Sequence, residues 1–597
     1  MEKEPSKQTH EKPNFLILMV DQERYPSVYE NNELKKWRKE NLIAQELLRE
    51  NGFEFQNHYA GSTACSPSRT TLYTGQYPSL HGVTQTSGAA KSAFDSDMFW
   101  LDPNSVPTIG NYFRNAGYRT FWKGKWHASD EDILIPGTKN AYSSYTSTGV
   151  PAPKKVETYL SADRLNAYGF SGWVGPEPHG SSPRNSGSSA SIGINGRDEI
   201  YASETIELLQ SLEQQSHPSP WLIMCSFVNP HDIAIFGELS KLSPLFNFQI
   251  DSSVPNIPKA PTSDESLSTK PSAQESYRLT YPKALQPVYD NQFYRKLYYS
   301  LQMQADQEML KVYHALKKSR FYENTIVIFL SDHGELLGAH GKQHQKWYNM
   351  YEESVHVPLI IHSPKLFSGK QNTEMLTSHI DVLPTMLGLA GIDAEEIQEH
   401  LSDSHTEVYP LVGRDLTPLL KGKQNFFRAN EPLYFMTDDD FTRGQNQVSA
   451  TGEPYESVVQ PNHIEAIITT LTTGIKGEKE IWKLARYYDN PQFWSNPGCY
   501  DETVTQEDAT KAGYEEVCSL CITRTKYNPL PDQYELYNLS SDPLEEKNLA
   551  STKYQTPETE IVMNLLISAL EEQCRQKRLV PSSGVVQGMP SCNCLNE

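Results

Sequence analysis

The stretch "NFLILMVDQ" (residues 14–22) decides the fold, because it is a short apolar run that ends in two polar residues. Phe15 to Val20 are six apolar residues in a row. This is the length of a strand buried on both faces, and it is far too short to span a membrane. Short apolar runs of this kind alternate along the chain with helical patterns. We therefore predict an α/β fold, with a large, mostly parallel sheet sandwiched by helices.

The same alternation places the other elements of this sheet. Further strands are expected at 118–123, 221–228, 326–330 and 357–362, and helices at 42–52, 199–215 and 294–318. After residue 422 the alternation weakens, and a smaller antiparallel sheet is predicted from strands at 463–474, 480–488 and 534–539, followed by a helix near 557–573. These patterns predict three parts, a catalytic α/β domain, a smaller α+β subdomain and a tail, over residues 13–425, 426–575 and 576–597.

Two long irregular stretches interrupt the larger part, at 136–198 and 236–290, and both are rich in polar and turn-forming residues. Structureless loops of this length inside a compact domain are usually functional or disordered. We expect them to be loops on the substrate side, and flexible surface insertions are the alternative.

Composition limits the class of partner. A net charge of −21 over 597 residues repels phosphate, so we expect neither a nucleic-acid nor a membrane partner. The N-terminal stretch contains no secretory signal, and eight cysteines in so long a chain do not form a disulfide framework. The chain is therefore expected to be cytoplasmic and reduced. The Cys518/Cys521 pair alone is weak evidence for zinc.

Polar residues follow several of the expected strands. The carboxyl ends of parallel strands meet at one edge of a sheet, where ligands of open α/β folds bind. Each residue alone is ordinary, as a cap, a turn former or a structural histidine, but together they form an unusual set: Asp21, Gln22, Lys125, His127, His231, Asp332 and His333. The oxygen ligands of this set favour Ca²⁺ or Mg²⁺, and a histidine ligand makes Mn²⁺ an alternative. Lysines and histidines would supply the local positive charge that an anionic substrate needs.

At this point the chain resembles a known family. "CSPSRTTLYTG" (65–75) is similar to the sulfatase signature C-x-P-S-R-x-x-x-L-T-G, with Tyr73 interrupting the usual Leu-Thr. "GKWH", "PHD", "SDHGE" and "YEESVHVPLII" also resemble sulfatase stretches, in the same order. The similarity runs from about residue 13 to residue 550. It implies the fold of the alkaline phosphatase superfamily and hydrolysis of a sulfuric ester.

The resemblance also implies roles for individual residues. Cys65 would be oxidised to formylglycine by a formylglycine-generating enzyme, and the hydrate of this aldehyde would be the nucleophile. A divalent cation, with Ca²⁺ expected before Mn²⁺ or Mg²⁺, would be bound by Asp21, Gln22, Cys65, Asp332 and His333. Arg69, Lys125 and His127 would hold the hydrate, with His127 as the base. His231 and Lys346 would bind sulfate and protonate the alcohol, although Lys342 and His344 lie close to Lys346 in the sequence.

One departure from the pattern keeps other functions open. Gln22 stands where many sulfatases have a second Asp, and an Asp-Gln pair resembles the branch of choline sulfatases and phosphonate monoester hydrolases. The alternatives are thus a phosphonate monoester or phosphodiester hydrolase, or an inactive binding protein if Cys65 is not modified. The alcohol of the small sulfated substrate is open between carbohydrate, alkyl, choline and aryl. The C-terminal helix and tail could support a homo-oligomer.

Overall fold

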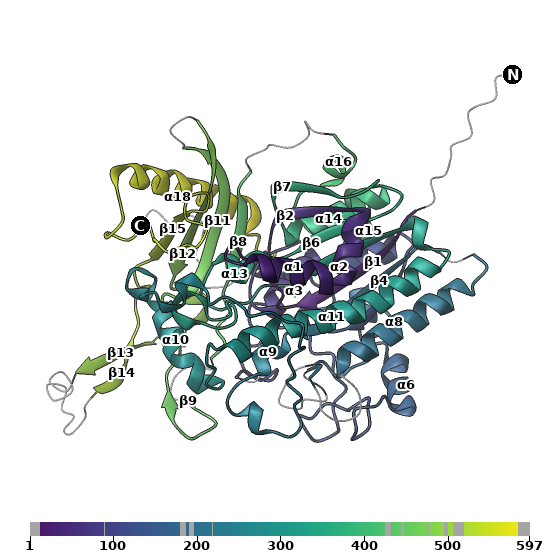
Figure 1. Cartoon of the computed structure of the whole chain (residues 1–597), viewed down its shortest axis with the longest axis horizontal. Coiled ribbons are helices and arrows are strands. Elements are labelled where there is room, and N and C mark those ends of the chain that lie inside the picture. The colour runs from purple at the N-terminus through teal and green to yellow at the C-terminus, as the bar shows by residue number, and fades with distance from the viewer. Residues whose placement is uncertain are drawn as a thin grey trace.

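The fold is taken from a computed structural model, which describes residues 12–88, 90–178, 185, 187–189, 196–217, 219–423, 431–442, 447–473, 477–494, 499–505 and 519–582. Its largest element is a seven-stranded sheet with helices on both faces (Figure 1). The strand order is β3-β4-β1-β5-β6-β2-β7, and only β6 runs antiparallel to its neighbours. The strands are β1 (Asn14–Asp21), β2 (Gly52–Tyr59), β3 (Arg119–Gly124), β4 (Trp221–Pro230), β5 (Thr325–Ser331), β6 (Leu359–His362) and β7 (Gln371–Ser378). The predicted α/β class and mostly parallel sheet are confirmed.

Strand β1 lies inside the sheet, between β4 and β5, and is buried along its whole length. Its side chains alternate between two hydrophobic cores. Phe15, Ile17 and Met19 belong to the core shared with α3 (Cys65–Thr74), α5 (Ile109–Asn115) and α14 (Val382–Ala390). Leu16, Leu18 and Val20 belong to the core shared with α2 (Ile43–Glu50), α8 (Arg197–Glu213) and α11 (Gln292–Lys318). A strand covered by helices on both faces has no solvent side, which explains its unbroken apolar run.

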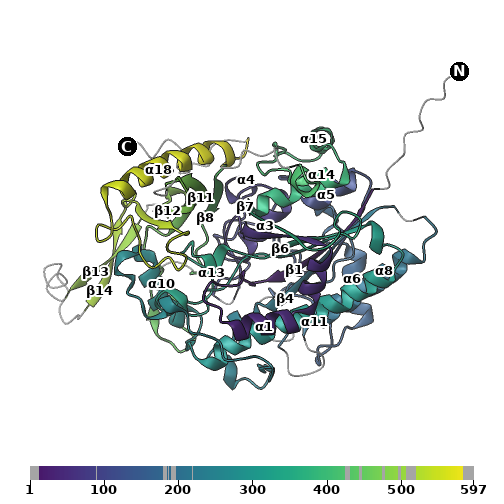
Figure 2. The same ribbon diagram turned by 45° about the horizontal axis from the view of Figure 1, so that its top comes forward.

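A smaller antiparallel sheet lies beside the first in both views (Figures 1 and 2). Its order is β15-β12-β11-β8, from strands β8 (Leu433–Thr437), β11 (His463–Thr472), β12 (Lys479–Tyr488) and β15 (Gln533–Asn538). Helix α18 (Pro557–Lys577) covers one face and contributes Leu566 and Leu570 to a shared core with Leu484 and Leu536. The predicted small sheet with a packed helix is confirmed, and β8 is an additional strand. The proposed domain boundary near 425 falls at 424–430, outside the described residues.

Several expectations from the sequence need correction or lie outside the described residues. The two irregular stretches contain helices, α6 (Pro153–Ala162) in the first and α10 (Ser272–Ala284) in the second. Cys65 and Cys225 are free thiols, but Cys574 is disulfide-bonded, so the expectation that all cysteines are reduced is wrong there. Cys518 lies outside the described residues, and of Cys521 only the backbone is described. None of the helices in the described ranges is long and apolar enough to cross a membrane.

Candidate active site

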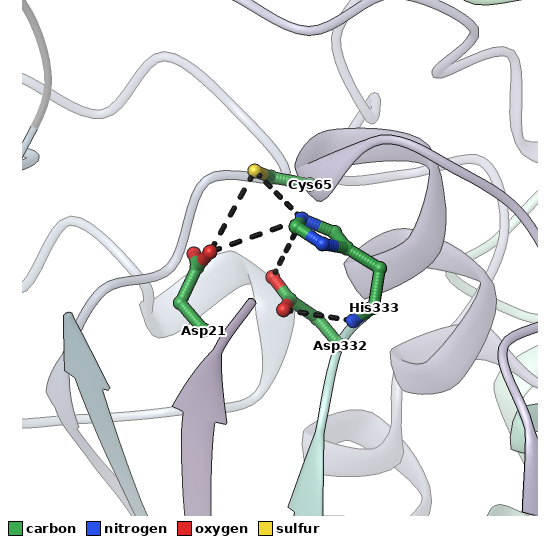
Figure 3. A group of neighbouring side chains, drawn as sticks. All are labelled: Asp21, Cys65, Asp332 and His333. Atoms are coloured by element: carbon green, nitrogen blue, oxygen red, sulfur yellow. Dashed lines mark hydrogen bonds and ion pairs between the residues drawn. The ribbon is translucent and has the colours of Figure 1, made fainter. Parts of the chain in front are cut away.

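The adjacent carboxyl ends of β1 and β5 place four side chains together. Val20 pairs with Ser331 in the sheet, so Asp21 and the Asp332–His333 pair leave the two strands at the same edge. Helix α3 begins at Cys65 directly above this edge, and the four side chains point toward one another (Figure 3). Ligand atoms of Asp21, Cys65, Asp332 and His333 all lie within 4.8 Å of one another. The structure thus brings together residues separated by up to 312 positions in the sequence.

Arg69, one helical turn after Cys65, ties the two carboxylates of this group together. Its Nη2 donates to Asp21 Oδ2 at 2.8 Å, and its Nε donates to Asp332 Oδ2 at 2.9 Å. The remaining nitrogen donates to the carbonyl oxygen of Lys125 and to Ser226 Oγ. The guanidinium is fully buried, and these hydrogen bonds direct it to the carboxylates. Arg69 therefore fixes the two carboxylates beside Cys65, and its expected contact with the hydrate stays a prediction.

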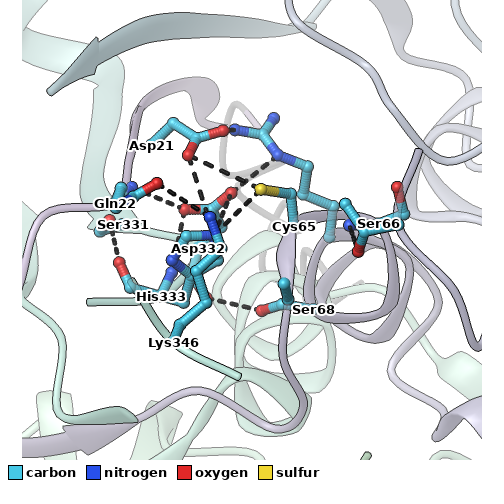
Figure 4. Close-up of polar contacts among 12 residues, drawn as sticks. Asp21, Gln22, Cys65, Ser66, Ser68, Ser331, Asp332, His333 and Lys346 are labelled. Atoms are coloured by element: carbon cyan, nitrogen blue, oxygen red, sulfur yellow. Dashed lines mark hydrogen bonds and ion pairs between the residues drawn. The ribbon is translucent and has the colours of Figure 1, made fainter. Parts of the chain in front are cut away.

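Gln22 is held from both ends of its amide (Figure 4). Its Oε1 accepts a hydrogen bond from Lys346 Nζ at 2.9 Å, and its Nε2 donates to Glu335. Because Lys346 can only donate and the carboxylate only accepts, the orientation of the amide is settled, with its oxygen on the side of Lys346. Glu335 was not expected at the site from the sequence, although it is the last residue of "SDHGE". It also accepts from Tyr294 and from two backbone N–H groups.

A cavity of about 420 Å³ opens above Cys65. The other residues of the expected catalytic set line it too: Lys125, His127, His231 and Lys346. Lys125 Nζ donates to Asp21 Oδ2 at 2.6 Å, and His127 Nε2 lies 3.0 Å from Ser87 Oγ. Lys342 and His344 lie elsewhere, because Lys342 faces Asp264 and the ring of His344 faces Tyr294. The described lining of the cavity therefore includes Lys346 but neither Lys342 nor His344.

Glu177 holds the turn that carries Lys125 and His127. It was not expected at the site, because its position in a long loop is no signal of a role. Its Oε1 accepts from the backbone N–H groups of Trp126 at 3.1 Å and His127 at 2.9 Å. The backbone of His127 is in the left-handed region, with φ of 57°. Such a conformation is uncommon for a residue with a side chain, and the carboxylate stabilises it. Burial raises the pKa of Glu177 to about 7.

Asp439 reaches the same site from the segment after β8, and it was also missed. Its carboxylate accepts from the backbone N–H of Ala64, the residue before Cys65, at 2.9 Å. It also accepts from the backbone N–H and the hydroxyl of Thr86 and from Trp347 Nε1. One buried carboxylate therefore links the start of α3, the wall of the cavity and the residue after Lys346.

The charges of the site shift the ionisation of its members in a consistent way. Burial alone would raise the pKa of the Asp21 carboxyl, but the charges of Lys125 and Arg69 hold it well below its ordinary value. Burial and Asp21 raise the pKa of the Cys65 thiol, but Lys125 and Lys346 outweigh them and lower it. Burial and Lys125 lower the pKa of His231 well below its ordinary value, so this imidazole is neutral. The described lining of the cavity carries Lys125 and Lys346 and no carboxylate, which favours anions, whereas the carboxylates of Asp21 and Asp332 lie below it, around Cys65.

The donor groups at the floor fit a divalent cation. His333 Nδ1 lies 3.0 Å from the carbonyl oxygen of Gly334 and donates to it, which leaves the lone pair of Nε2 free to face Cys65 Sγ at 3.1 Å. Two carboxylates and one imidazole nitrogen then converge, with the amide oxygen of Gln22 beside them. A set dominated by oxygen, with a single nitrogen, suits Ca²⁺, Mg²⁺ or Mn²⁺.

Comparison with known proteins agrees with this geometry. The model of a family described as Sulfatase matches residues 13–392. An uncharacterized sulfatase, YidJ of Escherichia coli (strain K12), is 29% identical over 398 residues, covering 65% of this chain and 69% of that protein. The choline-sulfatase of Rhizobium meliloti (strain 1021) is 26% identical over 405 residues, with 65% and 69% covered. The crystal structure of the phosphonate monoester hydrolase of Agrobacterium radiobacter shares the fold at a TM-score of 0.53 and 18% identity, covering 95% of this chain and 96% of that chain.

Proposed function

We propose that this chain, which belongs to the sulfatase family, hydrolyses sulfuric esters with a nucleophile made from Cys65. One observation carries the proposal. Cys65 is 2% exposed at the start of α3, and its sulfur faces Asp21 and His333 at the floor of a cavity that is lined by Lys125 and Lys346. A structural cysteine has no need of such surroundings, whereas a nucleophile attacking an anionic ester requires them.

The proposed modification explains why a cysteine stands at this position. Formylglycine at position 65 would supply, as its hydrate, two hydroxyls on one carbon, the first to attack sulfur and the second to release sulfate when it is deprotonated. The cation proposed at Asp21, Gln22, Asp332 and His333, with the residue at position 65, would supply charge that polarises a sulfate oxygen and activates the nearby hydroxyl. Ca²⁺ is expected, and the imidazole ligand gives Mn²⁺ more weight than the carboxylates alone would.

The surrounding residues position this nucleophile. Arg69 holds Asp21 and Asp332 in fixed orientations, so the carboxylates need no rearrangement during the reaction. The ammonium of Lys125, whose pKa is raised above its ordinary value by Asp21 against the effect of burial, stays charged beside the nucleophile. We assign to His127 the removal of the proton from the second hydroxyl, because its ring faces the same cavity.

The alcohol side of the reaction is assigned to His231 and Lys346. A neutral His231 cannot donate a proton, and in the free enzyme burial and Lys125 keep it neutral. A bound sulfate ester brings a negative charge that offsets the lysines and raises this pKa, so the histidine becomes able to donate to the leaving alcohol. Lys346 would bind a sulfate oxygen in exchange for its present contact with Gln22.

A phosphonate monoester or a phosphodiester is the second candidate substrate, and Gln22 is the observation that favours it. Gln22 places a neutral amide where many sulfatases have a second carboxylate, and the Asp-Gln pair resembles the branch of choline sulfatases and phosphonate monoester hydrolases. The positive lining of Lys125 and Lys346 would accept either anion. We rank the sulfate ester first, because Lys125 and His127 follow the sulfatase pattern.

Two measurements test the proposal. The mass of the peptide that contains Cys65, from active enzyme made in the native host, should show loss of sulfur and two hydrogens and gain of one oxygen. Active enzyme with an unmodified thiol throughout would refute the formylglycine mechanism, and a fully unmodified, inactive protein would favour a binding role. The kcat/KM for a sulfate ester should exceed that for the phosphonate ester of the same alcohol, and a large phosphonate preference would reverse the order.

A further inference from the structure

The cavity above Cys65 has two ends of different chemistry. The reacting end holds Cys65 and the positively charged or histidine side chains described above. The walls beyond it include six large apolar side chains: Ile235, Leu239, Phe246, Leu285, Trp347 and Phe441. They come from the segment after β4, the end of α10, the segment after α12 (Ala339–Lys342) and the segment after β8. Four distant parts of the chain thus contribute apolar surface to one wall.

We infer that this wall takes an apolar, uncharged alcohol, so that the substrate is an alkyl or aryl sulfate rather than a sugar sulfate or choline sulfate. The inference rests on the proposed sulfatase function and extends it to the leaving group. Trp347 and Phe441 form an aromatic corner, with ring centroids 5.3 Å apart. Leu239 is 41% exposed, and an apolar side chain left in water at the mouth of a cavity gains free energy when a ligand covers it.

The two side-chain amides of the described wall are already engaged by the protein. The amide of Gln286 donates to the carbonyl of Ile235 and accepts from the backbone N–H groups of Leu239 and Ser240. Gln345 donates to Tyr281 and accepts from Lys346. A sugar placed here would exchange the hydrogen bonds of its hydroxyls with water for contacts with methyl groups and rings, which is costly.

The charges of the described wall disfavour ionic alcohols as well. The described lining residues include no Asp or Glu, so no carboxylate of the lining would pair with the ammonium of choline. The additional lysine of the wall, Lys91, donates to Gln85 and to Asp97 and is 1% exposed. It is therefore neutralised by its own partner and does not offer a site for the carboxylates or further sulfates of an acidic sugar.

Primary sulfates of matched leaving groups test this inference, because their reactivity differs little and their contacts differ greatly. The probes are ethyl, butyl and hexyl sulfate, choline sulfate and glucose 6-sulfate, used with enzyme whose conversion at Cys65 has been verified by mass. Burial of each added methylene should raise kcat/KM by about two- to fourfold. Hexyl sulfate should exceed both choline sulfate and glucose 6-sulfate by at least about tenfold.

A flat alkyl series, or a higher kcat/KM for choline sulfate or glucose 6-sulfate, would overturn the inference while leaving the sulfatase function intact. No sulfate release from any of the five esters would instead overturn the proposed function, and this inference with it. Leu239→Gln should lower the hexyl-to-ethyl ratio of kcat/KM by about threefold or more. Leu242→Gln is the matched control. Leu242 lies three residues after Leu239, is 82% exposed and is not one of the described lining residues, so this variant should leave the hexyl-to-ethyl ratio unchanged. Equal effects of the two variants would count against the apolar wall.

Discussion

Asp439 offers the sharpest test of how the site is held together. The carboxylate accepts four hydrogen bonds: from the backbone N–H of Ala64, the backbone N–H and hydroxyl of Thr86, and the indole N–H of Trp347. The substitution Asp439→Asn keeps the shape of the side chain but leaves one carbonyl oxygen. In the best orientation the amide satisfies three of the four donors and turns its own N–H₂ toward the backbone N–H of Thr86.

The expected magnitude follows from this count. One buried donor left unsatisfied, together with loss of the charge on the other three bonds, should lower the free energy of unfolding by about 2–4 kcal/mol. The start of α3 and Thr86 then lose part of their common anchor. Because the reacting group at position 65 follows Ala64 directly, a small displacement should lower kcat by at least about tenfold, with a smaller change in KM.

The neighbouring Asp438 provides the control. It is equally buried, and its Oδ1 accepts from His463, Tyr488 and Asn490, all within the smaller sheet and the segment after it. Urea unfolding and steady-state kinetics of Asp439→Asn and Asp438→Asn should be compared, with rates normalised to the fraction of Cys65 converted. We expect kcat to fall for Asp439→Asn only. If both variants lose kcat equally, or if neither does, Asp439 serves stability alone and the reasoning is refuted.

Three further outcomes are expected. Burial raises the pKa of Glu177 to about 7 in the folded protein, so ionisation of this carboxyl destabilises the fold as the pH rises from about 4.5 to 7. The unfolding free energy of the wild type minus that of Glu177→Gln should therefore fall by about 2–3 kcal/mol between about pH 5 and about pH 8. A difference that stays constant with pH would contradict this. Gln22→Glu places a second carboxylate against Glu335 and should destabilise the fold by about 3 kcal/mol. The double variant Gln22→Glu/Glu335→Gln should recover most of this lost stability, measured by thermal unfolding. No recovery would mean that the two side chains do not act as a pair. Lys125→Ala and His127→Ala should each lower kcat by about 100-fold or more. Lys123→Ala is the control and should keep near-normal turnover, because the ammonium of Lys123 contacts Gly172 and Glu204 instead. Normal rates for the first two variants would reject the proposed roles of Lys125 and His127.

Strands could be predicted from the sequence where both of their faces are buried. β1 and β5 are unbroken apolar runs, and polar residues at their ends could be placed at one edge because parallel strands share a direction. β2 and β7 were missed, because they lie at the side of the sheet and carry polar residues such as Glu54 and Asn372 that give no apolar run. Sequence pattern reports the local environment, and at the side of a sheet that environment is mixed.

The residues missed at the site share a physical reason. Glu177, Glu335 and Asp439 do not line up with any strand end; each acts by accepting hydrogen bonds from backbone groups or from another side chain of the site. Such contacts depend on how loops return to the sheet, which no local pattern specifies. Glu335 had the best signal, since it lies two residues after His333 in "SDHGE". Asp439 had none, and it lies beyond the family match that ends at residue 392.

The long sequence separation between Ala64 and Asp439 has a consequence for the timing of synthesis. The carboxylate that accepts the backbone N–H of Ala64, at the start of α3, is supplied 375 residues later in the chain. At about 5–20 residues per second, the segment around Cys65 would wait about 20 to 75 seconds before this anchor emerges from the ribosome. In the finished fold Cys65 and Arg69 are almost fully enclosed, so an enzyme that must grip this segment would find it exposed only during that interval. Maturation of the nucleophile would then compete with folding, and slower translation would favour the modified product.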